Sequence, residues 1–529
     1  MTAQLFHHGN IYTGESFAEA FVLEDGLFKA VGTDEELLNS YPDAEKINLK
    51  GRFVCAGFND SHMHLLNYGQ FLMIARLDEH TSSLKELIGY MKEYAKDNTG
   101  SWIVGRGWNQ DFFADVKRMP AKHDLDEISK DVPVLLTRAC GHVCAVNSRL
   151  LEIAGIDKDT PSPEGGAIDF ENGILCDNAI DILERYKPLP DKEEIKKMIL
   201  KACASLNSFG ITSSQSDDYC VFRQIPYETV NEAYRELSEE GKLTVRVNEQ
   251  ANFTSLNDLK DFIDHGNRTG SGDRMFRIGP LKMLGDGSLG GRTAHLSVPY
   301  ADDPSTCGFS LFSQEQFDEM IGYANQEGMQ VAVHAIGDAC LDKVLDAIDK
   351  ALKVHPRYDH RHGIVHCQIS RKDQLERMAK LKLHIYAQSV FLDYDNHIVQ
   401  ARAGKELAST SYSWKTLMKK GLVISNGSDA PVEIPDVMKG IECAVTRTSL
   451  DGCGPYLKEE AFSVKEAIDS FTINGAIASF EEGYKGKIAP GYLGDFVILN
   501  KDPFHTEKNR LHEIEVCATY LNGKCIYKK

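Results

Sequence analysis

The chain has 529 residues, of which 42% are hydrophobic and 26% charged, and its formal net charge is −19 at pH 7. A chain of this length can bury one large core and a smaller second one. The negative balance repels phosphate backbones and anionic lipid surfaces, so we expect neither nucleic acid nor a membrane as a main partner.

The cellular compartment can also be predicted from the sequence. No apolar run reaches the ~18–20 residues that cross a bilayer. The first ten residues, MTAQLFHHGN, lack the basic and apolar segments of a secretory signal. The 13 cysteines are scattered and odd in number, unlike a disulfide framework. We therefore expect a cytoplasmic protein.

The two ends of the chain carry the pattern of short strands. Asp25-Gly26 and Asn522-Gly523 each lie between two apolar stretches, which is typical of β-hairpin turns. Residues 1–54 and 484–529 are therefore predicted to form one small β-sandwich built from both chain ends. The barrel described next would then occupy residues 55–483.

In the middle of the chain, short apolar segments alternate with helix-like ones. A helical pattern over 192–209, for example, ends at Gly210, a plausible C-cap. The predicted strands cover residues 52–64, 210–216, 243–253, 276–284, 330–337, 361–368, 383–390 and 422–429. Strands that alternate with helices favour a parallel sheet, and eight of them predict an α/β fold of the (β/α)₈ TIM-barrel type. Residues 67–190 are too many for one crossover, so we expect an inserted subdomain after the first barrel strand.

Polar side chains stand at the ends of these predicted strands. His62 and His64 alternate along the first strand, so both imidazoles would point to the same face. Four later strands end, or nearly end, in a polar residue: Lys282, His334, His366 and Asp429. The carboxyl ends of barrel strands form one rim, and a buried charge there is costly unless it is paired or bound to metal. The sequence therefore predicts a divalent-metal site at this rim.

Each of these residues also has a simpler interpretation. His334 could be a hydrogen-bonded core histidine, and Lys282 could be part of a salt bridge. His362, four residues before His366, competes for the same role on the same strand. Asp429 could cap a helix that follows Pro431. The metal hypothesis rests on all of these positions occurring together.

The order of these residues resembles the amidohydrolase superfamily, which carries HxH on the first barrel strand, Lys on the fourth, His on the fifth and sixth, and Asp on the eighth. The chain is most similar to the YtcJ-like branch, amidohydrolase family 3, over nearly its whole length. The phrases that carry this similarity include GWNQ (107–110), LKMLGDGSLGGRTA (281–294), VHAIGD (333–338) and SNGSDAPVE (425–433). GITSSQSDD departs from relatives that often show a histidine and an acid there, which puts ligands from the second strand in doubt.

The resemblance implies a role for each residue of the set. His62, His64 and Asp429 would bind one metal, and His334 and His366 a second, with a carbamylated Lys282 bridging the two. An unmodified lysine beside a single metal is the alternative. Zinc suits these ligands, although manganese, iron or nickel would also fit. Asp429 would accept a proton from the metal-activated water and return it to the departing nitrogen.

Four further residues are weaker candidates for substrate binding. Trp108 and His142 lie in the predicted insertion, and simple packing is the alternative for both. Asp286 and Arg292 lie in the loop after the fourth strand, where an ordinary salt bridge would explain them equally well. The same loop contains GDGSLG, but no helical pattern follows, so the motif does not predict a dinucleotide site.

We therefore expect an enzyme that hydrolyses a C–N bond, in an amide, N-acyl or N-formyl group, of a small-molecule substrate. A mononuclear deaminase on the same scaffold is one alternative. A non-catalytic binding or regulatory protein with a relic metal site is another. The sequence leaves homo-oligomerisation open, and it does not identify the substrate because the barrel hosts many reactions.

Overall fold

The computed structural model describes residues 3–97, 102–139, 142–163 and 165–529. The chain divides into two compact units. The first joins Met1–Tyr68 to Ile195–Lys529, and the second is Gly69–Glu194.

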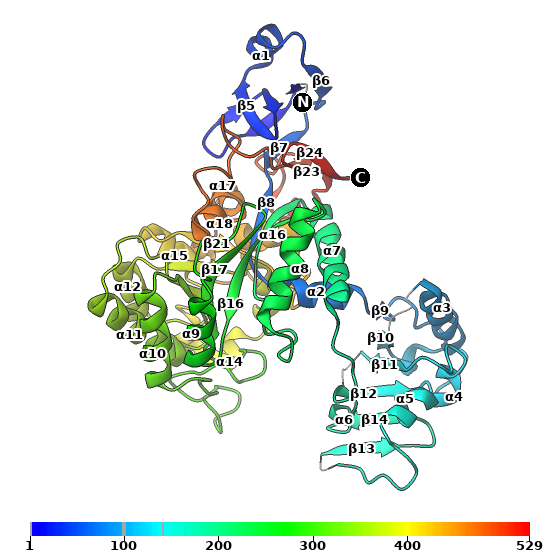
Figure 1. Ribbon diagram of the computed structural model, residues 1–529. Coiled ribbons are helices and arrows are strands. Elements are labelled where there is room, and N and C mark those ends of the chain that lie inside the picture. The colour runs from blue at the N-terminus through cyan, green and yellow to red at the C-terminus, as the bar shows by residue number, and fades with distance from the viewer. Residues whose placement is uncertain (1–2, 98–101, 140–141, 164) are drawn as a thin grey trace. The chain divides into compact units, whose positions relative to one another are not determined.

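An eight-stranded parallel sheet forms the centre of the first unit, in the order β21-β20-β19-β18-β17-β16-β15-β8 (Figure 1). Its strands are β8 (Phe58–Met63), β15 (Ile211–Ser216), β16 (Arg246–Asn252), β17 (Phe276–Leu284), β18 (Val331–Ala335), β19 (Gly363–His366), β20 (His384–Ala387) and β21 (Ile424–Asn426). The Asp429 N–H donates to the His62 carbonyl at 2.8 Å, and the His64 N–H donates to the Ala430 carbonyl at 2.9 Å. These bonds join the segment after β21 to the end of β8, so the sheet closes into the predicted TIM barrel.

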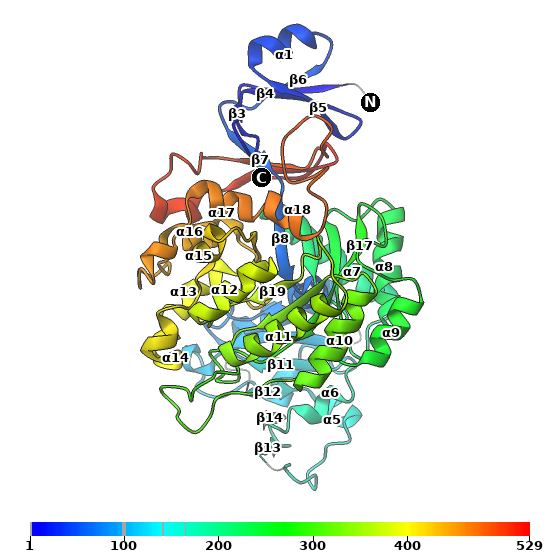
Figure 2. The same cartoon turned by 90° about the vertical axis from the view of Figure 1, so that its left-hand side faces the viewer.

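Helices follow the strands around the barrel, and their apolar faces explain their positions. In α11 (Asp338–Val354), buried Leu341, Val344, Leu345 and Ile348 recur every three or four residues. The other helices of this part are α7 (Lys192–Ser208), α8 (Tyr227–Glu239), α9 (Leu256–Asp264), α10 (Gln314–Gln326), α12 (Lys372–Leu381), α13 (Leu392–Asp395), α14 (Val399–Ala408), α15 (Trp414–Lys419), α16 (Val437–Thr446), α17 (Val464–Ser470) and α18 (Ile473–Ala478). Figure 2 shows α10, α11 and α12 side by side outside the strands. Among the described residues, no helix is both long and apolar enough to cross a membrane.

The first predicted strand, 52–64, is two strands in the structure. β7 (Phe53–Ala56) pairs with β22 (Phe496–Leu499) in a terminal sheet, whereas β8 pairs with β15 in the barrel. Gly57 separates them, and a Cβ atom there would lie 2.3 Å from the Thr212 hydroxyl oxygen. The absence of a side chain lets the backbone pass this close to β15 as it leaves one sheet for the other.

Both chain ends contribute to the terminal sheets. One has the order β5-β4-β1-β6, and the other has the order β24-β23-β22-β7-β2-β3. Their remaining strands are β1 (Gln4–His7), β2 (Asn10–Tyr12), β3 (Phe17–Ala18), β4 (Ala20–Glu24), β5 (Leu27–Gly32), β6 (Glu45–Asn48), β23 (Val516–Leu521) and β24 (Lys524–Lys528), and α1 (Asp34–Ser40) lies between β5 and β6. Phe496 stacks on Tyr520 at 4.3 Å and meets Phe6 edge-on at 5.3 Å, so the two ends share a core.

Both predicted hairpin turns are confirmed. Asp25 and Gly26 have φ values of 50° and 80° between β4 and β5. Asn522 and Gly523 have φ values of 50° and 72° between β23 and β24. Two successive left-handed residues give the type I′ turn, whose twist matches that of paired strands.

The second unit begins within α2 (Leu65–Leu72), the helix after β8, as the predicted insertion requires. It is built on a six-stranded sheet with the order β13-β14-β12-β11-β10-β9. Its elements are β9 (Ala75–Arg76), α3 (Leu84–Asp97), β10 (Ile103–Trp108), α4 (Lys122–Leu125), β11 (Val134–Arg138), β12 (Val143–Val146), α5 (Ser148–Ile153), β13 (Gly166–Asp169), β14 (Ile174–Asp177) and α6 (Asp181–Glu184). Buried side chains from α3, β10 and β11, including Leu87, Trp108 and Leu136, form a core of its own.

Candidate metal centre

Four of the predicted ligands meet at the carboxyl rim of the barrel. His62, His366 and Asp429 each offer a ligand atom within 4.8 Å of the other two, and all three are buried. Asp429 Oδ1 lies 3.3 Å from His62 Nε2 and 3.2 Å from His64 Nε2. Residues separated by more than 300 positions in the chain thus surround one carboxylate oxygen.

Two buried glutamines orient the rings of His62 and His366. Gln250 accepts a hydrogen bond from His62 Nδ1 at 2.7 Å, and its own amide N–H₂ donates to the Ser61 carbonyl. Gln388 accepts from His366 Nδ1 at 2.8 Å in the same way. Because an amide oxygen can only accept, both rings carry their proton on Nδ1 and leave Nε2 bare. A bare Nε2 is the form of histidine that binds a metal.

His64 is held by the backbone. Its Nδ1 donates to the Asp217 carbonyl at 2.9 Å, so its Nε2 also faces Asp429. Burial would lower the pKa of His64, but Asp429, Cys220 and Asp217 together outweigh burial and raise that pKa well above its usual value. Burial would raise the pKa of Asp429, yet His64, His62 and His366 lower it. The carboxylate therefore requires a positive charge beside it, either a proton or a cation.

The surroundings of Asp429 Oδ1 indicate whether these residues fit a metal. Asp429 Oδ1 is buried, and no donor in the described part of the chain aims an N–H or O–H at it with hydrogen-bond geometry. A buried acceptor without a donor is costly. Imidazole nitrogens and a carboxylate oxygen are the ligands that zinc and related divalent ions bind in hydrolases. The residues present therefore fit a divalent cation.

The backbone is strained at two of these positions. His366 and Asp429 have φ values of 72° and 60°, and Cys367, next to His366, has 49°. Such left-handed conformations are rare outside glycine and concentrate at functional sites. Asp429 is not a helix cap, because the helix that follows it, α16, is capped by Asp436.

Lys282 and Asp217 form a buried ion pair beside this cluster. Lys282 Nζ lies 3.1 Å from Asp217 Oδ2, and neither side chain has any exposed surface. Burial would raise the pKa of Asp217, but Lys282 and His64 outweigh it and lower that pKa. Asp217, His64 and Cys220 form a second group whose potential ligand atoms lie within 4.8 Å of one another.

Asp217 had not been predicted as a site residue. It directly follows β15, and the departure of this segment from relatives had put second-strand ligands in doubt. The signal was nevertheless present, since two acidic residues, Asp217 and Asp218, follow a fully buried strand. Gln250 and Gln388 were also missed, because a glutamine near a strand end has no distinctive spacing.

His334 lies next to His366, with ring centres 4.4 Å apart. Its Nε2 is 3.1 Å from the Gly287 carbonyl, which leaves Nδ1 bare. The alternative residue, His362, immediately precedes β19 and so lies at its amino end. Its Nδ1 accepts from the Val331 N–H, and its Nε2 bonds Asn325. Both nitrogens of His362 are used far from the rim, so the structure places His366 and not His362 in the cluster.

The two candidates in the loop after β17 have structural partners. The Asp286 carboxylate accepts from the backbone N–H groups of His295, Ile336 and Gly337 at 2.8–3.0 Å. Arg292 makes two hydrogen bonds to Asp302, at 3.0 and 3.1 Å. The salt bridge of Arg292 matches the structural alternative for that residue. Asp286 instead holds this loop against the end of β18 through backbone N–H groups.

The contacts of the two candidates in the second unit, among the residues that the structure describes, lie within that unit. Trp108 is fully buried, and its indole N–H donates to the Leu136 carbonyl at 2.9 Å. His142 is 76% exposed, with its Nδ1 3.2 Å from Asp177. Neither contact supports substrate binding, which stays a prediction for these two residues.

A closed parallel barrel with imidazoles and a carboxylate at its carboxyl rim defines the class of metal-dependent barrel hydrolases. Residues 45–527 match the model of the Amidohydrolase family, to which this chain belongs. The chain is 35% identical to the putative amidohydrolase YtcJ of Bacillus subtilis (strain 168), over 99% of both chains.

Two further comparisons agree with this assignment. The chain is 24% identical to an N-substituted formamide deformylase of Arthrobacter pascens, over 97% of this chain and 96% of that protein. It is also similar to a solved uncharacterized metal-dependent hydrolase from Pyrococcus furiosus, with a TM-score of 0.78, 30% identity and coverage of 95% and 100%. Family and site together support a hydrolase that uses a divalent metal.

Proposed function

We propose that this protein hydrolyses a C–N bond, in an amide, N-acyl or N-formyl group of a small molecule, with zinc as its metal. The observation that carries the proposal is the buried Asp429 Oδ1, which faces the Nε2 atoms of His62 and His64 and lacks an aligned donor. The similarity to a formamide deformylase supports a C–N bond as the target.

Each residue has a role in this proposal. His62, His64, His366 and Asp429 would hold the metal, and His334, whose ring lies next to that of His366, is a further potential ligand. The bound metal would lower the pKa of water to about 7 and polarise the carbonyl of the substrate. Asp429, kept ionised by the imidazoles around it, accepts the proton of the attacking water and returns it to the leaving nitrogen. Gln250 and Gln388 hold their two rings in one orientation throughout.

Lys282 can take two forms in this proposal. As a carbamate it would offer an oxygen anion to two metals at once. As an ammonium it pairs with Asp217, which is the contact seen in the structure. An ammonium that is paired with Asp217 belongs with a single metal, and so with a second candidate function, a mononuclear deaminase.

One experiment tests both functions. We would measure the metal content of the purified protein, then screen zinc- and manganese-loaded samples against N-acyl amino acids, N-formyl amines and cyclic amides. Equal amounts of amine and acid would support the amide hydrolase. Ammonia without an acid product would favour the deaminase. A protein that neither retains a metal nor turns over any of these compounds would refute both.

A further inference from the structure

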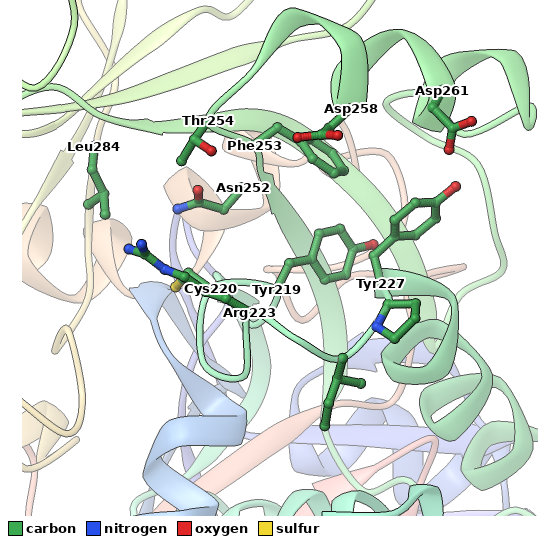
Figure 3. Close-up of a pocket in the computed structure, with 12 residues that line it drawn as sticks. Tyr219, Cys220, Arg223, Tyr227, Asn252, Phe253, Thr254, Asp258, Asp261 and Leu284 are labelled. Atoms are coloured by element: carbon green, nitrogen blue, oxygen red, sulfur yellow. The ribbon is translucent and has the colours of Figure 1, made fainter. Parts of the chain in front are cut away.

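A pocket of about 350 Å³ lies at the carboxyl rim of the barrel, between the loop after β15 and the end of β16 (Figure 3). Its walls include Tyr219, Cys220, Arg223, Tyr227, Asn252 and Phe253. This volume lies at the lower end of the range for ligand pockets and is large enough for a phenyl-sized group.

The inner wall of this pocket adjoins the metal centre. Asn252 donates to Asp217 Oδ2 at 2.9 Å, and Cys220 Sγ lies 3.3 Å from Asp217 Oδ1. The backbone carbonyl of the same Asp217 holds the ring of His64. A substrate whose scissile bond sits at Asp429 would therefore extend one of its substituents into this pocket.

One side of the pocket is aromatic. The rings of Tyr219, Tyr227 and Phe253 lie 5.7–5.9 Å from one another. Tyr219 and Phe253 are each only 8% exposed, so they form a fixed surface. Figure 3 shows the three rings grouped together. Such a wall favours an aromatic or branched apolar group.

Arg223 supplies the only basic side chain among the lining residues. It is exposed, and no carboxylate in the described part of the chain pairs with it. Its guanidinium extends toward Asn252 and Leu284 (Figure 3), and Asn252 is the lining residue that bonds Asp217. The acidic lining residues, Asp258 and Asp261, lie on α9, and Asp258 is used to cap that helix with Ser255. The pocket is therefore cationic at its inner end and anionic at the α9 side.

We propose that this pocket selects the substrate: it takes an aromatic or branched apolar group, and Arg223 binds a carboxylate next to the scissile C–N bond. The substrate class is then an N-acyl or N-formyl derivative of an apolar amino acid. A guanidinium binds a carboxylate through charge-assisted hydrogen bonds, which are stronger than neutral ones. The identity of the scissile bond in this inference rests on the proposed function. The binding of a substrate carboxylate rests on the pocket alone.

Binding of a compound that cannot be hydrolysed tests the pocket independently of turnover. We would titrate zinc-loaded protein with 3-phenylpropionate and with the neutral 3-phenylpropanol in a calorimeter. Arg223→Gln should weaken binding of the carboxylate about 10- to 100-fold and leave the alcohol unchanged. Arg223→Lys should restore part of the affinity. Arg52→Gln, which changes an exposed arginine before β7, should have no effect.

Kinetics supply the second readout. Arg223→Gln should raise the KM for N-formylphenylalanine by the same factor, while kcat/KM for N-formyl-2-phenylethylamine, which lacks the carboxylate, should not change. Unaltered binding of 3-phenylpropionate by Arg223→Gln would overturn the pocket assignment even if amides are hydrolysed. Arg223-dependent binding without hydrolysis of any amide would uphold the pocket and overturn the proposed function.

Discussion

Replacing Gln250 by leucine should weaken metal binding without removing any ligand. In the wild type, the Gln250 amide oxygen accepts from His62 Nδ1 at 2.7 Å, and both side chains are buried. Leucine leaves that N–H without an acceptor, or allows the proton to move to Nε2, where it would block the metal. Either result costs about 1–3 kcal/mol.

The loss in affinity can be estimated from the same contact. Removing the partner of a metal-binding histidine typically costs about 10–100-fold in affinity, which equals about 1.4–2.8 kcal/mol. At saturating zinc, the metal should therefore stabilise Gln250→Leu against unfolding by about 1.4–2.8 kcal/mol less than it stabilises the wild type.

The assay is a zinc titration in competition with a chromophoric chelator, together with urea unfolding of the metal-free protein. Gln330→Leu is the matched control. Gln330 is fully buried before β18 and donates to the carbonyls of Arg361 and Ala478. Its loss should lower stability and leave zinc affinity unchanged. Wild-type zinc affinity in a folded Gln250→Leu protein would refute the ligand role of His62.

Three further predictions concern the proton acceptor, a buried acid and the shared terminal core. Asp429→Asn should retain metal and lower kcat at least about 100-fold, because the proton acceptor is lost; near-normal turnover would contradict that role. Burial raises the pKa of Asp395 to about 6, so the folded state favours its protonated form and loses stability as pH rises from about 4 through 6. Between pH 4 and pH 7, the free energy of unfolding in urea should fall by about 2–3 kcal/mol less for Asp395→Asn than for the wild type. An identical pH dependence in both proteins would contradict a raised pKa for Asp395. Phe496→Ala should lower the free energy of unfolding by about 3–5 kcal/mol, because the ring is fully buried against Tyr520 and Phe6; a loss below about 1 kcal/mol would show that the two chain ends do not depend on this core.

Much of the fold could be predicted because its signals are local. Alternating apolar segments mark the strands, and Asp-Gly or Asn-Gly pairs mark the hairpins whose φ values the structure shows. The ends of parallel strands share one rim by topology, so His62, His366 and Asp429 could be predicted to meet without any knowledge of distances. The division of residues 52–64 at Gly57 could not, because it depends on the close approach of Thr212 from a segment about 150 residues away.

Strand periodicity and strand ends are encoded within a few positions, so the barrel, its shared rim and most of the residues that gather there could be predicted from the chain's local patterns. Which polar groups pair at that rim depends instead on the folded arrangement. Lys282 meets Asp217, His62 meets Gln250, and Asp286 is occupied by backbone N–H groups. These pairings join residues between 9 and 188 positions apart, and whether two side chains meet across a barrel depends on packing that no local pattern records.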